Sequence, residues 1–411
     1  MVWPRRGVRK LESPGALIDN RQPFFMVMST VLMLSCQRDH FDIPPDITYL
    51  NCAYMSPLPL EATRQGQLGV AAKAHPWSIT PADFFTDSER SRTLFARLIG
   101  ASAGDVAIVP AVSYGMATAA SNLPLAEGQS VVVLADQFPS NVYAWQQRAK
   151  AVGASLHTVP RPADGAWTRA VLDRLDASTA VVACPHCHWT DGGRLDLPRI
   201  GERCRALGVA LVVDATQSLG VMPFSVAEVQ PDFLVAGAYK WLLGPYSYGF
   251  VYIHPRWQEG LPLEHNWIAR NGSEDFSGLV QYREDFQPGA RRFDVGERSN
   301  FTLTPMVIAS LELLLGWGTR AIGQYLGHLN ARAATGARAR GLELLPEGQR
   351  APHLLGLRWP GGVPEDLAAR FARQGIHVSI RGDAVRVSPH VYNDEADIDR
   401  FLQVLGTGAG G

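Results

Sequence analysis

The feature that most constrains the fold is a series of seven short apolar segments, separated mostly by amphipathic helical patterns. Each segment is rich in β-branched residues and is bounded by Gly, Pro, Asp or Ser. Continuous apolar character predicts strands buried on both faces, and the strand–helix alternation predicts a doubly wound, mostly parallel α/β sheet. The segments are 106–109, 131–134, 155–159, 179–184, 210–214, 232–237 and 249–253.

Length and composition exclude several classes of protein. The 411 residues are 46% hydrophobic and 19% charged, which is too apolar for an intrinsically disordered chain. The 38 basic and 39 acidic residues give a formal net charge of −1, so we expect no nucleic-acid partner. Five cysteines are too few for a disulfide framework, which favours a reducing, cytoplasmic location.

Changes in the pattern predict the division of the chain. We expect a leader or a mis-assigned start over 1–35, an N-terminal segment joining the small domain over 36–60, a large domain over 61–305, and a small α+β domain over 306–411. The apolar run 24–34 follows a basic stretch but is too short to span a bilayer, which needs about 20 residues. A signal-peptide core and an over-extended start are the two interpretations of this run. No membrane partner is expected.

Polar and reactive side chains follow four of the predicted strands, at the point where each strand ends. Because ligands of doubly wound sheets bind at the carboxyl ends of the strands, we expect these side chains around one site. They are Ser113 and Tyr114 after 106–109, Phe138 after 131–134, Asp214 and Gln217 after 210–214, and Tyr239 and Lys240 after 232–237.

These residue types together suit one cofactor. A lysine at the end of a buried strand loses hydration, which favours its neutral, nucleophilic amine and a Schiff base with an aldehyde. A neighbouring aspartate can hold a pyridinium proton, a helix N-terminus can bind a phosphate, and a phenylalanine can stack on a flat ring. Alone, each has a structural explanation as a surface lysine, helix cap, turn or core residue. Their occurrence together at strand ends indicates a pyridoxal phosphate (PLP) site.

Three segments carry a resemblance to a known family: VVDATQSLG, DFLVAGAYKWLLGP and YGFVYI. They resemble the class V aminotransferase family of fold-type-I PLP-dependent enzymes, which includes cysteine desulfurases, kynureninase and isopenicillin N epimerase-like enzymes. The resemblance extends from about Tyr49 to about Tyr392. It implies a large domain with a seven-stranded, mostly parallel sheet, a small α+β domain, PLP as cofactor, an amino acid substrate and a homodimer.

The same resemblance implies roles for residues around the cofactor. Lys240 forms the internal aldimine and later moves the Cα proton. Asp214 pairs with the pyridine nitrogen, and Gln217 donates to the phenolic oxygen of the ring. Ser113, together with the N–H group of Tyr114, holds the phosphate.

The resemblance also implies contacts farther from the lysine. Phe138 stacks on the face of the cofactor ring, and Tyr54 borders the substrate pocket. Arg386 matches the arginine that binds the substrate carboxylate, a bidentate task suited to a guanidinium group. Ser299 and Asn300 are candidates to reach the phosphate of the partner subunit.

Two departures from the family pattern bear on the chemistry. Cysteine desulfurases carry a nucleophilic cysteine late in the chain, whereas the last cysteine here is Cys204 on a predicted helix, which argues against persulfide chemistry. The family often has Ser and His at the positions of Gly237 and Tyr239, so part of the phosphate contact differs. We still expect Tyr239 to border the cofactor.

The run Cys-Pro-His-Cys-His at 184–188 has three interpretations. It matches haem-attachment, redox and zinc half-site patterns, but a zinc site needs two more ligands, and none has convincing spacing. We therefore expect no metal. The family resemblance implies that the run forms a wall of the cofactor pocket, with redox-sensitive thiols as the alternative. His186 is the member expected to touch cofactor or substrate, and His188 or Trp189 could take that role.

These observations predict a PLP-dependent enzyme that acts on an amino acid through an external aldimine and Cα deprotonation. A class V aminotransferase is the main hypothesis. The alternatives are a PLP-dependent lyase, desulfurase-like or kynureninase-like, and an epimerase. A thiol-redox or haem protein built on Cys184 and Cys187 is a more distant alternative, as is a non-catalytic regulator.

Overall fold

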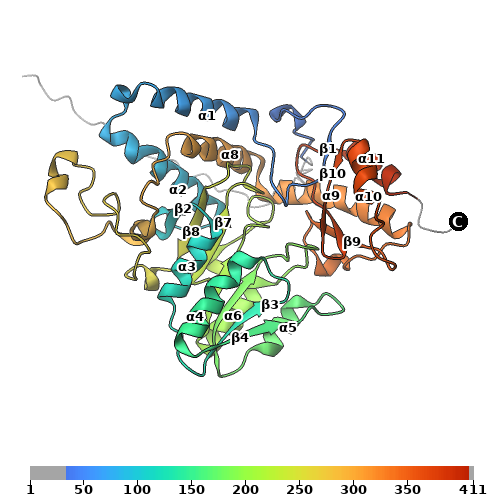
Figure 1. Ribbon diagram of the computed structural model, residues 1–411, viewed down its shortest axis with the longest axis horizontal. Coiled ribbons are helices and arrows are strands. Elements are labelled where there is room, and N and C mark those ends of the chain that lie inside the picture. The colour runs from blue at the N-terminus through green and yellow to red at the C-terminus, as the bar shows by residue number, and fades with distance from the viewer. Residues whose placement is uncertain (1–33, 407–411) are drawn as a thin grey trace, which may run out of the picture. The chain divides into compact units, whose positions relative to one another are not determined.

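A seven-stranded sheet forms the centre of the protein in a computed structural model that describes residues 34–406 (Figure 1). Its strand order is β2-β8-β7-β6-β5-β3-β4, and neighbours pair in parallel except β8, which is antiparallel to both β2 and β7. The predicted fold class is confirmed. The strands are β2 (Val106–Val109), β3 (Ser130–Leu134), β4 (Ser155–Val159), β5 (Thr179–Pro185), β6 (Ala210–Asp214), β7 (Phe233–Gly237) and β8 (Gly249–Ile253).

Helices cover both faces of this sheet because successive strand residues point to opposite faces. On one face, apolar strand residues pack with those of α3 (Val112–Asn122) and α4 (Tyr143–Val152). On the other face they pack with α2 (Thr86–Ile99), α5 (Trp167–Arg174) and α6 (Leu197–Leu207). Strands β6 and β7 are buried throughout, as their continuous apolar sequences predict.

Strand β4 does not follow the prediction of burial on both faces. It forms an edge of the sheet and pairs only with β3. Its residues Ser155 and Thr158 are exposed, and only Val159 is buried. A strand with a neighbour on one side needs less apolar surface than a central one, which accounts for its mixed composition.

The C-terminal part contains a smaller sheet of order β11-β12-β9 and a two-stranded pair in which β1 runs parallel to β10. Residues 48–49 near the N-terminus thus pair with the C-terminal region, and helix α1 packs on α8. The strands are β1 (Thr48–Tyr49), β9 (Leu355–Arg358), β10 (Ile376–His377), β11 (Ser379–Arg381) and β12 (Ala384–Val387). The remaining helices are α1 (Leu60–Lys73), α7 (Val226–Val229), α8 (Leu303–Trp317), α9 (Thr319–Arg338), α10 (Leu367–Arg373) and α11 (Glu395–Leu405).

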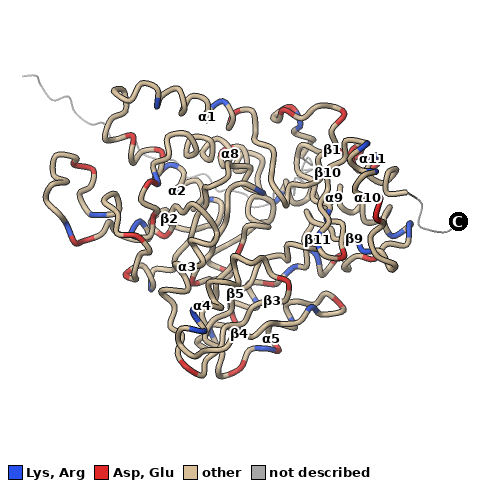
Figure 2. The backbone as a smooth tube through the Cα atoms, viewed as in Figure 1, with Lys and Arg blue, Asp and Glu red and all other residues tan. Residues whose placement is uncertain are grey.

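The predicted leader lies outside the described residues except for its last two positions. Over the described range, no single helix is long and apolar enough to cross a membrane. Helices α8 and α9 satisfy that requirement only when taken together, and they are bent by 77° at their junction. Acidic and basic positions are interspersed along the described chain (Figure 2).

Candidate active site

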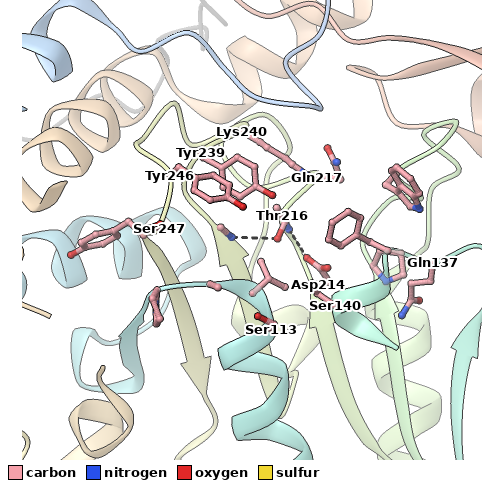
Figure 3. Close-up of a pocket in the computed structure, with 18 of the residues that line it drawn as sticks. Ser113, Gln137, Ser140, Asp214, Thr216, Gln217, Tyr239, Lys240, Tyr246 and Ser247 are labelled. Carbon is pink, nitrogen blue, oxygen red and sulfur yellow. Dashed lines mark hydrogen bonds between the residues drawn. The ribbon is translucent and has the colours of Figure 1, made fainter. Parts of the chain in front are cut away.

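Five strand ends converge on one cavity of about 220 Å³ (Figure 3). Residues that follow β2, β3, β5, β6 and β7 line it, as expected for the carboxyl edge of a parallel sheet. Six of the side chains predicted from the sequence are brought together here: Ser113, Phe138, Asp214, Gln217, Tyr239 and Lys240.

Lys240 follows β7 and is buried, with only 5% of its surface exposed. Its Nζ atom lies 5.1 Å from the ring centre of Phe138 and 5.3 Å from that of Tyr239. Burial lowers the pKa of the amine to about 8, and the positive charge of Arg386 contributes in the same direction. Near neutral pH the neutral, nucleophilic form of the Lys240 amine is therefore more populated than in an exposed lysine.

Asp214, the last residue of β6, is buried and has no ion-pair partner among the described residues. Its Oδ1 accepts the backbone N–H of Thr216 at 3.0 Å, and the Thr216 hydroxyl accepts the N–H of Gly237 at 3.3 Å (Figure 3). Burial raises the pKa of the carboxyl group, while the hydrogen bonds from Thr216 oppose that rise. A buried acid that makes no ion pair within the described residues suits a ligand that offers a positively charged N–H group.

The amide of Gln217 is fixed by two neighbours. Its Oε1 accepts the indole N–H of Trp241 at 2.7 Å, and its Nε2 donates to the carbonyl of Ala53 at 3.1 Å. Because an amide nitrogen carries two hydrogens, one N–H of Gln217 is left for a ligand in the cavity.

The N-terminus of α3 offers backbone donors to an anion. The N–H groups of Val112 and Ser113 have no backbone acceptor within the described range, and both residues line the cavity. The N–H of Tyr114, predicted as a phosphate donor, donates to the carbonyl of Ala111 at 3.1 Å, and its role toward a phosphate stays a prediction. This hydrogen bond closes the first turn of α3. The N–H groups of Val112 and Ser113 make no such bond.

Close packing holds α3 against the sheet. A Cβ atom built at Gly115 would lie 2.7 Å from side-chain carbons of Val235 on β7 and Val251 on β8. No side chain fits at that distance, so glycine lets the helix lie unusually near the strands. The position of the free N–H groups at its first turn depends on this contact.

Arg386 on β12 is almost fully buried and lies outside the cavity lining. Its Nη1 donates to the carbonyl of Trp189 at 2.9 Å, while its Nε has no hydrogen-bond partner. No carboxylate of the described residues lies within ion-pair distance of it. Burial lowers the pKa of the guanidinium to about 9, and the charge of Arg381 adds to this effect.

Three other predicted residues lie outside the cavity. Tyr54 is half exposed. The Ser299 hydroxyl donates to the carbonyl of Phe84, and the Asn300 side-chain oxygen accepts the N–H groups at the start of α8. The roles of Ser299 and Asn300 toward a partner subunit stay predictions, as does that of Tyr54 at the substrate pocket.

The Cys-Pro-His-Cys-His run continues β5 past its end, and its alternate residues face the cavity. Pro185, Cys187 and Trp189 line the cavity, whereas the ring of His186 lies on the other side, 5.9 Å from that of Phe224. Of the residues predicted from this run, Trp189 rather than His186 lines the cavity, and its contact with the cofactor stays a prediction. Burial raises the pKa of the Cys187 thiol, and the described residues contain no group of three metal-binding side chains.

Several cavity residues were not predicted from the sequence: Gln137, Ser140, Thr216, Tyr246, Ser247 and Tyr248. The available signal was the Tyr-Ser-Tyr run that follows Gly-Pro just after Lys240. Backbone strain marks the same places, because Asp136, Leu243 and Ser247 have φ angles of 54°, 56° and 64°. Such left-handed non-glycine residues concentrate at functional sites.

The family model for class-V aminotransferases matches residues 70–401 of this chain. The chain belongs to the class-V aminotransferase family. An uncharacterized aminotransferase of Bacillus subtilis strain 168 is 30% identical over 322 residues, covering 77% of this chain and 83% of that protein. The isopenicillin N epimerase of Streptomyces clavuligerus is 25% identical over 387 residues, covering 88% and 95%.

A solved structure of C-DES, a cystine C-S lyase, shares the fold. Its variant with glycine covalently linked to the PLP cofactor aligns with a TM-score of 0.80 at 19% identity, over 90% of this chain and 99% of that one. As a member of the class-V family, the protein whose sequence is given above is a PLP-dependent enzyme.

The described residues of this class-V enzyme fit PLP. Lys240 would hold the aldehyde carbon, the unpaired acid Asp214 the ring nitrogen, and the free N–H groups at Val112 and Ser113 the phosphate. The remaining N–H of Gln217 would reach a ring oxygen. When bound, PLP accepts the electron pair released as a bond at Cα breaks. Lys240 is then the group placed to take and return the Cα proton.

Proposed function

We propose that this protein is an aminotransferase that acts on an α-amino acid. The observation that carries the proposal is the acid–base character of the cavity. Among the described lining residues, Lys240 is the one whose pKa is lowered toward neutrality, to about 8. Burial raises the pKa of Tyr239 and of Tyr248 to about 12 and raises that of the Cys187 thiol, so these groups stay protonated near neutral pH.

One base suffices for transamination. A proton leaves Cα and returns to a carbon of the cofactor on the same face, and a single lysine can make both transfers. Epimerisation delivers the proton to the opposite face of Cα and needs a second acid, a role that a protonated tyrosine of the lining such as Tyr239 can fill. Persulfide chemistry needs a thiolate, which burial disfavours at Cys187. The raised pKa of the Cys187 thiol therefore favours transamination over persulfide chemistry, and the titration described below separates transamination from epimerisation.

Arg386 supports a carboxylate on the substrate. A buried guanidinium with one hydrogen bond and no anionic partner in the described chain is electrostatically incomplete. A carboxylate can satisfy it with two parallel hydrogen bonds. Its positive charge also lowers the pKa of the Lys240 amine.

The assembly and the location of the protein form a second part of the proposal. We propose a cytoplasmic homodimer, on the family resemblance and on exposed apolar side chains along one segment. Leu68 and Val70 on α1 are 51% and 60% exposed, and Trp77 beyond its end is 80% exposed. The five cysteines are free, which agrees with a reducing compartment. Light scattering of the holoenzyme at micromolar concentration would give a dimer mass, and a monomer mass would contradict the proposed assembly.

The test of function is the visible absorbance of the PLP-loaded protein during titration with single L-amino acids. An aminotransferase converts its cofactor stably to the pyridoxamine form, and a keto acid added afterwards restores the original band. A band that shifts and returns without a keto acid, with ammonia released, would identify a lyase. Loss of optical activity of the amino acid without either change would identify an epimerase. Either result would overturn the proposal.

A further inference from the structure

A second arginine lies beside Arg386 on the same hairpin. Strands β11 and β12 pair antiparallel, with Ser379 opposite Arg386 and Arg381 opposite Ala384. Opposed residues share a face of the hairpin, and so do alternate residues along one strand, which places both arginines on one face.

Both arginines lie against one side chain of the cavity wall. The guanidinium carbon of each is 5.9 Å from the ring centre of Trp189, and this ring lines the cavity. Arg386 is buried, whereas Arg381 is partly exposed. The indole is held in place by its N–H, which donates to the carbonyl of Asp136 at 2.7 Å.

The carboxylates in this neighbourhood already have other partners. Asp191 binds both Arg161 and Arg358, and Arg358 also binds Asp383 at 3.1 Å. Asp136 lies 3.4 Å from Arg161. Within residues 34–406, no carboxylate lies within 4 Å of Arg381 or Arg386.

The two free cations repel each other. The charge of Arg381 lowers the pKa of Arg386 and also that of Lys240. Two guanidinium groups of like charge, one of them buried, destabilise this region unless anions neutralise them. A ligand with one carboxylate satisfies only one of them.

We propose that Arg381 and Arg386 form a subsite for two carboxylates, so that the substrates are amino acids with an acidic side chain and the matching dicarboxylic keto acids. Arg386 binds the α-carboxylate, and Arg381, nearer to solvent, binds the side-chain carboxylate. This inference rests on the proposed function because it names the substrate class of that same site.

Binding of glutarate tests the subsite without turnover. Glutarate has two carboxylates and no amino group, and valerate is its counterpart with one carboxylate. In calorimetric titrations of the PLP-loaded enzyme we expect glutarate to bind at least about tenfold more tightly than valerate. Arg381→Gln should abolish this preference. Arg373→Gln, which removes an exposed arginine of α10 with no ion pair in the described residues, should preserve it. Equal binding of the two acids, or a preference unchanged in Arg381→Gln, would overturn the inference.

Turnover gives a second readout. We expect the wild-type kcat/KM to favour L-glutamate or L-aspartate over L-glutamine and L-asparagine. Arg381→Gln should reduce this preference about tenfold or more while amide substrates keep their rates, whereas Arg386→Gln should slow all of them. Glutarate selectivity without amino transfer from any amino acid would contradict the proposed function alone. Amino transfer from neutral amino acids without glutarate selectivity would contradict the subsite alone.

Discussion

The two walls of the cavity are built in different ways. The cofactor wall carries Asp214, the last residue of β6, and Lys240, which lies three residues past the end of the adjacent, paired strand β7. The wall that we call the substrate wall is formed by Trp189, and Arg386, which lies outside the cavity lining, donates to the Trp189 carbonyl from a position 197 residues away. Asp191, two residues after Trp189, links this wall through ion pairs to other segments. The substrate side combines the pairing of β11 and β12 with ion pairs of charged side chains, so substitutions of charged residues should affect the two walls differently.

The largest effect is expected on the cofactor wall. Lys240→Ala removes both the covalent attachment of the cofactor and the proton-transfer group, so we expect turnover to fall by a factor of about 10³ or more. Lys150→Ala, which changes an exposed lysine of α4, is the matched control and should keep full activity. Steady-state rates and the cofactor absorbance of both variants are the measurements. Turnover near the wild-type rate in Lys240→Ala would refute the assignment of this lysine.

Asp214→Asn should be the next largest. The amide oxygen can still accept the N–H of Thr216, but the negative charge beside the ring nitrogen is lost. We expect kcat to fall by about 10²–10³, as when a preorganised electrostatic contact is removed. Asp232→Asn is the matched buried control, because Asp232 binds the N–H of Leu211 and the Arg256 guanidinium. It should lower stability but leave kcat of the folded enzyme unchanged, and equal loss of kcat in both variants would argue against the role of Asp214.

On the substrate wall, a change of charge should act first on stability. Asp191→Asn leaves Arg161 and Arg358 without their buried anion, so we expect a loss of about 3 kcal/mol in the free energy of unfolding. Asp383→Asn, which removes the exposed partner of Arg358, should cost less than about 1 kcal/mol. Denaturant unfolding of the two variants measures the difference. Similar losses in both would show that burial of Asp191 contributes nothing.

The loss of stability in Asp191→Asn should also depend on pH. Burial raises the pKa of Asp191, but His188 and the arginines outweigh it and hold the pKa below its ordinary value. A carboxylate with a lowered folded pKa stabilises the protein above its unfolded pKa of about 4 and loses that contribution as the pH falls through the folded pKa. The stability gap between wild type and Asp191→Asn should therefore be constant above about pH 5 and shrink at lower pH.

The smallest expected effect concerns reattachment of PLP to the cofactor-free protein. Because the pKa of Lys240 is lowered to about 8, its neutral fraction grows about tenfold per pH unit below 8 and levels off above it. The rate of recovery of the PLP absorbance should follow this curve. A rate that still rises between pH 9 and 10 would show a lysine with an ordinary pKa and would contradict the effect of burial on Lys240.

The cofactor wall was largely predictable from the sequence because its signals are local. Continuous β-branched runs mark buried strands, and polar residues at their ends converge through sheet topology alone. Lys240, Asp214, Gln217 and Phe138 were found in this way, and all line the cavity. The role of the N–H of Tyr114 stays a prediction, because the register of the first turn of α3 decides which donors are free.

The substrate wall was less predictable for physical reasons. Which residues after β5 face the cavity depends on how the strand alternation continues past Pro185. The sequence does not show this, so we predicted His186, whereas Trp189 lines the cavity. Arg381 carries no local signal, because its proximity to Arg386 arises only when β11 and β12 pair. The unpaired state of both arginines follows from ion pairs made by other segments, which a sequence pattern does not record.

The contact of Gly115 with the valines of β7 and β8 has a consequence for engineering this enzyme. A methyl group at this position would push the first turn of α3 away from the strand ends, and the N–H groups of Val112 and Ser113 would move with it. The strength with which these N–H groups would bind the phosphate of PLP therefore depends on the packing of α3 against β7 and β8. Graded substitutions at Val235 and Val251, which make or remove room under the helix, could set how long the enzyme retains its cofactor on dilution while every residue that touches the cofactor stays the same.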